Sequence, residues 1–299
     1  MFFFLGNYSS KKTLPSIPGF EGSGFVVLSG GGLLGWKLVG SKVAVTASER
    51  LNQGCWAEYM LAEASLCLPL ENDTSYQEGA CCFVNPLTVL GFLDVCETEG
   101  YKSIIHTAAA SSLGKMLVRH FTSKNFQVIN IVRREEQEEI LRKEGAKYIL
   151  NQTDPEFHEK LKKLCTELDC RCCFDAVAGE LTGRIIAAMP SSSTVYVYGA
   201  LSLKPCEINA TDLIFRKKVV RGFWLRDYLD KKGFFGKAKM LYGLRSLIKG
   251  NLKTIIQKEF NLEEAQEAID YYKKHMSEGK VLIRPGQKKE EGVIEEKKE

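Results

Sequence analysis

A short run of small residues between two apolar segments is the feature best suited to bind a ligand. Its first, third and last residues fall at the spacing of the glycines in G-x-G-x-x-G, a pattern that lets a pyrophosphate approach backbone N–H groups at a helix N-terminus. Alanine and serine are small enough to keep that approach open, although each has a Cβ. The residues expected to contact the phosphates are Ala109, Ser111, Ser112, Leu113 and Gly114. Between the apolar runs 103–108 and 127–132, they predict a dinucleotide-binding strand–helix–strand unit.

Two arginines close the second of these runs. Arg133 follows Gly114 by 19 residues, near the ~20-residue offset at which a side chain meets the adenosine ribose. No Asp or Glu ends the run, and guanidinium groups suit a dianionic phosphate. Arg133 and Arg134 therefore favour NADPH over NADH. The alternative is that both arginines merely pair with the glutamates of residues 135–139.

Composition places the chain among ordinary soluble proteins, and its 299 residues are enough for two domains. The formal net charge of +4 gives no reason to expect nucleic acid or an anionic membrane as the main partner, and no apolar run predicts membrane insertion. The ten cysteines are scattered, many in apolar runs, which indicates a reducing intracellular compartment, cytoplasmic or mitochondrial matrix. The Lys- and Glu-rich tail 287–299 is expected to be disordered.

The pattern of elements changes along the chain. Residues 1–84 are β-rich, with strands expected at 25–28, 42–46 and 57–61, and the triple glycine 30–32 is interpreted as a turn between two strands. Ser75 and Glu78 have the spacing of a helix capping box. Strands and helices then alternate, which predicts a parallel sheet covered on both faces. The later segments are expected as strands 103–108, 127–132, 147–150, 172–177, 193–198, 218–223 and 280–284, and helices 113–123, 135–144, 156–168, 179–189, 233–249 and 262–276.

Short motifs recur along almost the whole chain. They are Pro18–Gly24, Gly40–Val43, Gly54–Tyr59, Asn85–Thr88, 109–114, Phe174–Gly179, Tyr198–Leu201 and Arg221–Leu225. Together they resemble the medium-chain dehydrogenase/reductase superfamily, and within it the chain is most similar to zinc-free quinone oxidoreductases and 2-enoyl thioester reductases. The resemblance implies an α/β fold: a Rossmann-type doubly wound parallel sheet (85–254) plus a β-rich, GroES-like catalytic domain (1–84 with 255–299).

Zinc is not expected. Zinc-bearing members of the superfamily carry a histidine where this chain has Phe20, and a benzyl group cannot ligate a metal. The cysteines at 165, 170, 172 and 173 lack zinc-site spacing. Without a Lewis acid, the expected activity is zinc-independent hydride transfer from NADPH to a quinone, an enone or a 2-enoyl thioester.

The resemblance also assigns site residues. Tyr8 is the expected proton donor, with a plain loop tyrosine as the alternative. Asn85 and Thr88 are expected to face the nicotinamide, unless they only cap a helix. The remaining expected cofactor contacts lie at strand ends, with a buried core position as the alternative for Trp224. They are Tyr198, Gly199, Ala200, Phe223, Trp224 and Leu225.

The N-terminus departs from the superfamily, whose members carry roughly 40–50 more residues ahead of Gly6, enough for several strands of a catalytic domain. The expectation is therefore an N-terminally shortened catalytic domain, with exposed sheet edges. Two hypotheses follow: an active enzyme, or a catalytically inactive structural subunit of a larger complex. The resemblance further implies a homodimer joined through the strands 193–198 and 218–223.

Overall fold

The computed structural model describes residues 14–48 and 50–286. Tyr8, the expected proton donor, and the charged tail 287–299 lie outside the described residues. The chain divides into two compact units, one made of the residues up to Phe83 and from Ile256 onwards, the other of Val84–Ile255. No described helix is both long and apolar enough to cross a bilayer.

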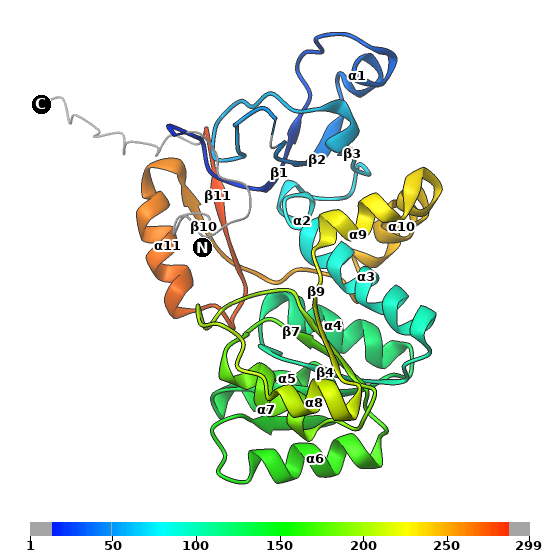
Figure 1. Cartoon of the computed structure of the whole chain (residues 1–299). Coiled ribbons are helices and arrows are strands. Elements are labelled where there is room, and N and C mark those ends of the chain that lie inside the picture. The colour runs from blue at the N-terminus through cyan, green and yellow to red at the C-terminus, as the bar shows by residue number, and fades with distance from the viewer. Residues whose placement is uncertain (1–13, 49, 287–299) are drawn as a thin grey trace, which may run out of the picture. The chain divides into compact units, whose positions relative to one another are not determined.

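The unit Val84–Ile255 is built on a six-stranded parallel sheet in the order β6-β5-β4-β7-β8-β9 (Figure 1). The order reverses between β4 and β7, so the chain crosses over at this point and a ligand-binding crevice is expected at the strands' carboxyl ends. This confirms the expected doubly wound sheet. The strands are β4 (Ser103–His106), β5 (Gln127–Val132), β6 (Tyr148–Asn151), β7 (Cys172–Asp175), β8 (Thr194–Val197) and β9 (Val219–Gly222).

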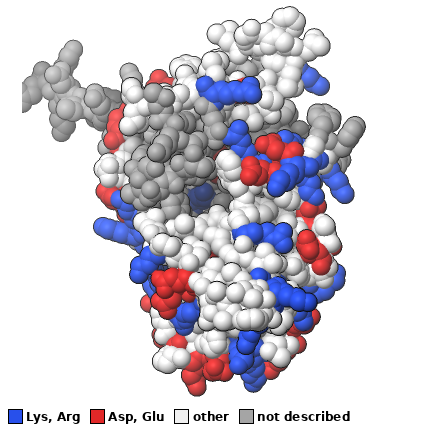
Figure 2. Space-filling view, in the orientation of Figure 1, with Lys and Arg blue, Asp and Glu red and all other residues white. Residues whose placement is uncertain are grey.

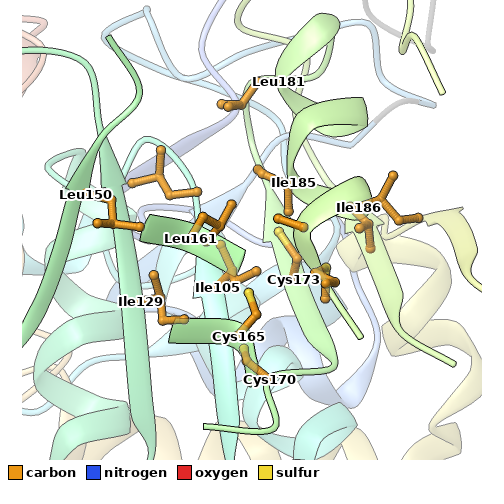
Figure 3. Packing of buried hydrophobic residues seen from close by; sticks show 14 of the residues in the cluster. Ile105, Ile129, Leu150, Leu161, Cys165, Cys170, Cys173, Leu181, Ile185 and Ile186 are labelled. Carbon is orange, nitrogen blue, oxygen red and sulfur yellow. The ribbon is translucent and has the colours of Figure 1, made fainter. Parts of the chain in front are cut away.

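Helices cover both faces of this sheet, as its near-continuous apolar strands require. One face packs against α6 and α7 in a cluster that includes Ile105, Ile129, Leu161 and Ile185 (Figure 3). On the other face the Phe92 ring stacks on Phe174, with centroids 3.9 Å apart. The helices are α3 (Val84–Glu99), α4 (Ser112–Ser123), α5 (Glu136–Lys143), α6 (Phe157–Glu167), α7 (Glu180–Ala188), α8 (Ala210–Arg216), α9 (Leu225–Lys231) and α10 (Gly233–Leu247).

Edge strand β9 is tied down by a buried lysine. Lys218 Nζ donates to the Ile186 carbonyl at 2.6 Å, near the C-terminal end of α7, and to Asp212 Oδ1 at 2.9 Å in α8. A cation at a helix C-terminus complements the helix dipole, and its carboxylate partner offsets the cost of burying the charge. The sequence predicted neither helix α8 nor helix α9, so this arrangement is a finding of the structure.

The second unit is β-rich. An antiparallel sheet, β1-β2-β3, and a parallel pair, β10-β11, are its two sheets. Its strands are β1 (Glu21–Phe25), β2 (Lys42–Thr46), β3 (Cys67–Pro69), β10 (Ile256–Asn261) and β11 (Lys280–Arg284). Its helices are α1 (Leu33–Leu38), α2 (Tyr76–Gly79) and α11 (Ala265–Lys274), with 3₁₀ turns η1 (Ala64–Leu66) and η2 (Leu262–Glu264).

Three expectations for this unit are wrong. The first strand is Glu21–Phe25 rather than 25–28, and no strand forms at 57–61. The triple glycine 30–32 leads into the short helix α1 rather than forming a simple turn. The capping box is confirmed, because Ser75 Oγ accepts the Glu78 N–H and Glu78 Oε2 accepts the Ser75 N–H at 2.9 Å.

Charges are mixed over the described surface. On the face shown in Figure 2, acidic and basic side chains are interspersed. This pattern fits the small net charge and gives that face no broad surface of one sign.

Candidate functional site

The turn between β4 and α4 packs tightly against the helix that follows it. Ala108 adopts a positive φ of 50°, the conformation that usually falls to glycine in such turns. Ser111 caps α4, its Oγ accepting the Gly114 N–H at 3.1 Å. A Cβ on Gly114 would lie 2.1 Å from the Ala109 carbonyl oxygen, so only glycine fits. The close helix–strand packing expected of Gly114 is present.

The backbone N–H groups of this turn fall into two sets. Ala109 donates to the Ile131 carbonyl at 3.2 Å and Ser111 to the Ala108 carbonyl at 2.9 Å, so these two donors serve the fold. Ser112 and Leu113 stand in the first turn of α4, where N–H groups have no acceptor within their own helix. The donors best placed for an anion are therefore those of Ser112 and Leu113, while Ala109 contributes a buried, small side chain.

A buried carboxylate fixes the base of the turn. Thr107 Oγ1 donates to Asp175 Oδ1 at 2.7 Å and accepts the Ala176 N–H at 2.8 Å, which links the ends of β4 and β7. Asp175 also accepts the Thr182 hydroxyl at 2.7 Å and the Val177 N–H at 2.9 Å. The motif Phe174–Gly179 marked this segment in the sequence, but the role of Asp175 depends on partners distant in the chain.

His106 and Tyr198 form a second link, from the end of β4 to the residue after β8. His106 Nε2 and the Tyr198 hydroxyl lie 2.8 Å apart, and Phe92 packs edge-on against the tyrosine ring. Burial lowers the pKa of His106 to about 3 and raises the pKa of Tyr198 well above its usual range. Both rings are therefore neutral. The phenol of Tyr198 serves this pair, which the sequence did not predict.

The residues after Tyr198 bring backbone close to the same edge of the sheet. A Cβ on Gly199 would lie 2.8 Å from the Ala176 carbonyl oxygen, and Ala200 is exposed. Glycine at position 199 therefore lets the segment after β8 lie close to the end of β7, and Ala200 stands exposed at the carboxyl end of β8.

Arg133 and Arg134 stand exposed directly after β5. Among the described residues the Arg133 guanidinium has no hydrogen-bond or ion-pair partner. Glu138 instead pairs with Arg142 at 3.8 Å and Glu139 with Lys143 at 2.9 Å. The expectation that both arginines pair with the following glutamates is therefore wrong for Arg133, whose charge is available to an anion.

Asn85 and Thr88 lie in the first turns of α3. The helix already includes Val84, so Asn85 is not the capping residue that the alternative required. Thr88 is buried and its hydroxyl donates to the Val84 carbonyl at 2.6 Å. The Asn85 side chain is half-buried and forms no hydrogen bond within the described part of the chain.

The segment after β9 divides between core and surface. Phe223 is buried, with its ring 4.9 Å from Phe92 and 5.3 Å from Tyr228, so its side chain packs in the core and its expected contact with the cofactor stays a prediction. Trp224 is 41% exposed and lies beneath the Arg226 guanidinium, so the buried alternative is wrong for it. Leu225 begins α9 and is half-buried.

No three His, Cys, Asp or Glu side chains gather to hold a metal ion among residues 14–48 and 50–286. The thiols of Cys165, Cys170, Cys172 and Cys173 are all buried. Burial raises the pKa of the last three well above its usual value, as expected for thiols that pack as small apolar groups.

Comparison with known proteins is consistent with this geometry. A family model described as zinc-binding dehydrogenase matches residues 112–237. A candidate NADPH:quinone reductase from Mesorhizobium loti has 32% sequence identity and a TM-score of 0.89, over 95% of this chain and 82% of that one. The chain belongs to the medium-chain dehydrogenase/reductase superfamily. It groups there with the quinone and enoyl reductases.

Two further proteins are similar to the chain at lower identity. The mitochondrial enoyl-[acyl-carrier-protein] reductase of Arabidopsis thaliana is 26% identical over 240 residues, which are 78% of this chain but 62% of that protein. The chain thus spans less than two thirds of that relative. Escherichia coli quinone oxidoreductase, solved with NADPH, shares the superfamily fold at a TM-score of 0.78 with 19% identity, over 94% of this chain and 88% of its own.

Proposed function

We propose that this superfamily member is a zinc-independent, NADPH-dependent oxidoreductase that reduces a quinone, an enone or a 2-enoyl thioester. The observation that carries the proposal is the unpartnered Arg133 guanidinium, within the described residues, at the end of β5 beside the turn that ends β4. Relatives named enoyl-[acyl-carrier-protein] reductase and a structure named for NADPH:quinone reductase support the substrate classes. The alternative of an inactive structural subunit has no support among these relatives.

The residues at the carboxyl edge of the sheet fit a dinucleotide. Gly114 keeps α4 close to the Ala109 backbone, where a side chain has no room, and the first-turn N–H groups of Ser112 and Leu113 suit a pyrophosphate. Arg133 and Arg134 would bind the 2′-phosphate, and Asn85, Gly199 and Ala200 are proposed to contact the nicotinamide half. The bound cofactor supplies the hydride. Tyr8, outside the described residues, is proposed to donate the proton that completes reduction.

The test is oxidation of NADPH by the purified chain with a panel of quinones, an enone and a 2-enoyl thioester. We expect turnover with at least one acceptor, and slower turnover with NADH at equal concentration. Arg133→Ser should raise the KM for NADPH about tenfold and leave kcat unchanged, since one charge-assisted hydrogen bond is worth about 1.5–3 kcal/mol. Absence of NADPH binding and of turnover with every acceptor would contradict the proposal.

Tyr8→Phe tests the proton donor within the same assay. We expect kcat to fall by at least about a hundredfold with little change in NADPH affinity, as removal of a general acid predicts. Tyr59→Phe, at an exposed tyrosine, is the control. Equal kcat for the two variants would remove Tyr8 from the mechanism.

We propose that the protein is a homodimer joined through β9. The N–H groups of Val219 and Phe223 donate inward to Ser193 and Val197 carbonyls, so those of Val220 and Gly222 point away from β8. Ile214 and Phe215 in α8, beside this edge, are 66% and 78% exposed. Strand β8 lies between β7 and β9, so of the two strands in the expected dimer contact only β9 lies at an edge of the sheet. The mitochondrial names of the relatives favour the matrix as compartment over the cytoplasm.

A further inference from the structure

Gln137, in the first turn of α5, holds the backbone that carries both arginines. Its Oε1 accepts the Arg133 N–H at 3.0 Å and the Arg134 N–H at 3.3 Å. The Gln137 N–H in turn donates to the Arg134 carbonyl at 3.1 Å. Arg134 and Gln137 thus each donate a backbone N–H to the other residue. These hydrogen bonds hold the backbone of the turn between β5 and α5. Gln137 is half-buried, whereas the two arginines are exposed.

The charged residues that follow β5 make the position of the two arginines important for binding a phosphate. Residues 133–136 contain two arginines and two glutamates, so their formal charges cancel and give a dianionic phosphate no net attraction. Glu138 and Glu139 are engaged with the cations of the next helical turn, at 3.8 and 2.9 Å. Glu135 and Glu136 stay exposed beside the arginines. Net charge alone therefore cannot favour a 2′-phosphate here, and selectivity requires that the guanidinium groups be held nearer to it than the carboxylates are.

We infer that Gln137 is a positioning residue that sets the preference for NADPH over NADH. It acts through the backbone of Arg133 and Arg134 and need not touch the coenzyme. The inference rests on the proposed function, and it deepens that function by assigning the coenzyme selectivity to a residue that the sequence did not single out. A preorganised turn binds more tightly because less conformational entropy is lost on binding.

The test compares Gln137→Ala, which removes the acceptor, with Gln137→Glu, which keeps an acceptor oxygen and adds a charge. Gln127→Ala, at the opposite end of β5, is the matched control. Dissociation constants are measured by calorimetry for NADPH, NADH, adenosine 2′,5′-bisphosphate and AMP. Melting temperature and the steady-state constants of any active acceptor are recorded for each variant.

Gln137→Ala should weaken NADPH and the bisphosphate about three- to tenfold, the worth of one ordinary hydrogen bond, while NADH and AMP change less than about twofold. The KM for NADPH should rise and kcat should stay the same. Gln137→Glu should keep the affinity for NADH and lose affinity for NADPH, with a loss that shrinks as salt is raised. Gln127→Ala should match the wild type.

Two outcomes overturn the inference. If Gln137→Ala weakens both coenzymes by the same factor, or leaves their ratio within about twofold of the wild type, Gln137 has only a structural role. In that case the wild type still prefers NADPH and the proposed function stands. A wild type that binds neither coenzyme would overturn the proposed function and this inference together.

Discussion

His106 is a buried imidazole that the fold keeps neutral. Its ring is fully buried and bonded through Nε2 to Tyr198, while Nδ1 has no partner among the described residues. A charged imidazolium there would lose its hydration without gaining an anion. The pKa of about 3 in the folded protein lies below the ordinary histidine value of 6.5. Between these pH values the unfolded chain binds a proton that the folded chain does not, so the free energy of unfolding must fall as pH drops.

Replacing His106 should flatten this acid dependence. We expect His106→Gln to lose less stability than the wild type between pH 6.5 and 4, by about 1.4 kcal/mol per pH unit at most. Tyr198→Phe keeps the imidazole buried and should retain the wild-type slope. Urea unfolding midpoints across this range measure both. A His106→Gln variant with the same slope as the wild type would show that His106 does not titrate on unfolding.

At the scale of elements, α4 packs closely against the end of β4, and the turn between them leaves no room for a larger side chain. The Gly114 contact with the Ala109 carbonyl, the Ser111 cap and the positive φ at Ala108 all fall within this turn. Glycine is required at position 114 because the backbone of Ala109 approaches closely, and not because of the φ of Gly114.

Gly114→Ala should therefore separate helix from strand. We expect the free energy of unfolding to fall by about 1–3 kcal/mol, the usual cost of overpacking. We also expect the affinity for NADPH to fall at least about tenfold. Gly243→Ala, in α10, is the control, because a Cβ there meets nothing within 4 Å. Thermal melts and calorimetric titration distinguish the two variants, and an unshifted Gly114→Ala protein would refute the packing argument.

At the scale of the molecule, the edge strand β9 carries both unpaired backbone donors and exposed apolar neighbours. Edge strands with such neighbours pair readily with another chain. The proposed dimer would bury this edge and join two sheets.

Phe215→Asp should convert the dimer to a monomer, because it places a charge among the apolar side chains of α8. Leu33→Asp, at a residue of α1 that is 85% exposed, should leave the dimer intact. Light scattering with size-exclusion chromatography reports the mass, expected at twice 33.5 kDa for the wild type and the control. A wild type that runs as a monomer contradicts the proposal.

The sequence predicted the nucleotide unit well and the β-rich unit poorly, for physical reasons. From β4 to β8, largely buried apolar strands alternate with amphipathic helices, and this periodicity is local. Strand β1 instead reads Glu-Gly-Ser-Gly-Phe, with little β propensity, and is formed by pairing with β2. The apolar residues Val27 and Leu28, expected as strand, are 54% and 85% exposed beyond it.

The sequence by itself determined which residues form the turn between β4 and α4, because glycine and small residues are needed there whatever surrounds them. It also determined that Arg133 and Arg134 end a strand. Only the tertiary structure decided which side chains serve a ligand and which serve the fold. Tyr198 and Phe223 turned inward, and Asp175, His106 and Gln137 became the residues that hold the site's edge. His106 and Asp175 bond residues ninety-two and sixty-eight positions away in the chain, and local periodicity carries no information on such pairings.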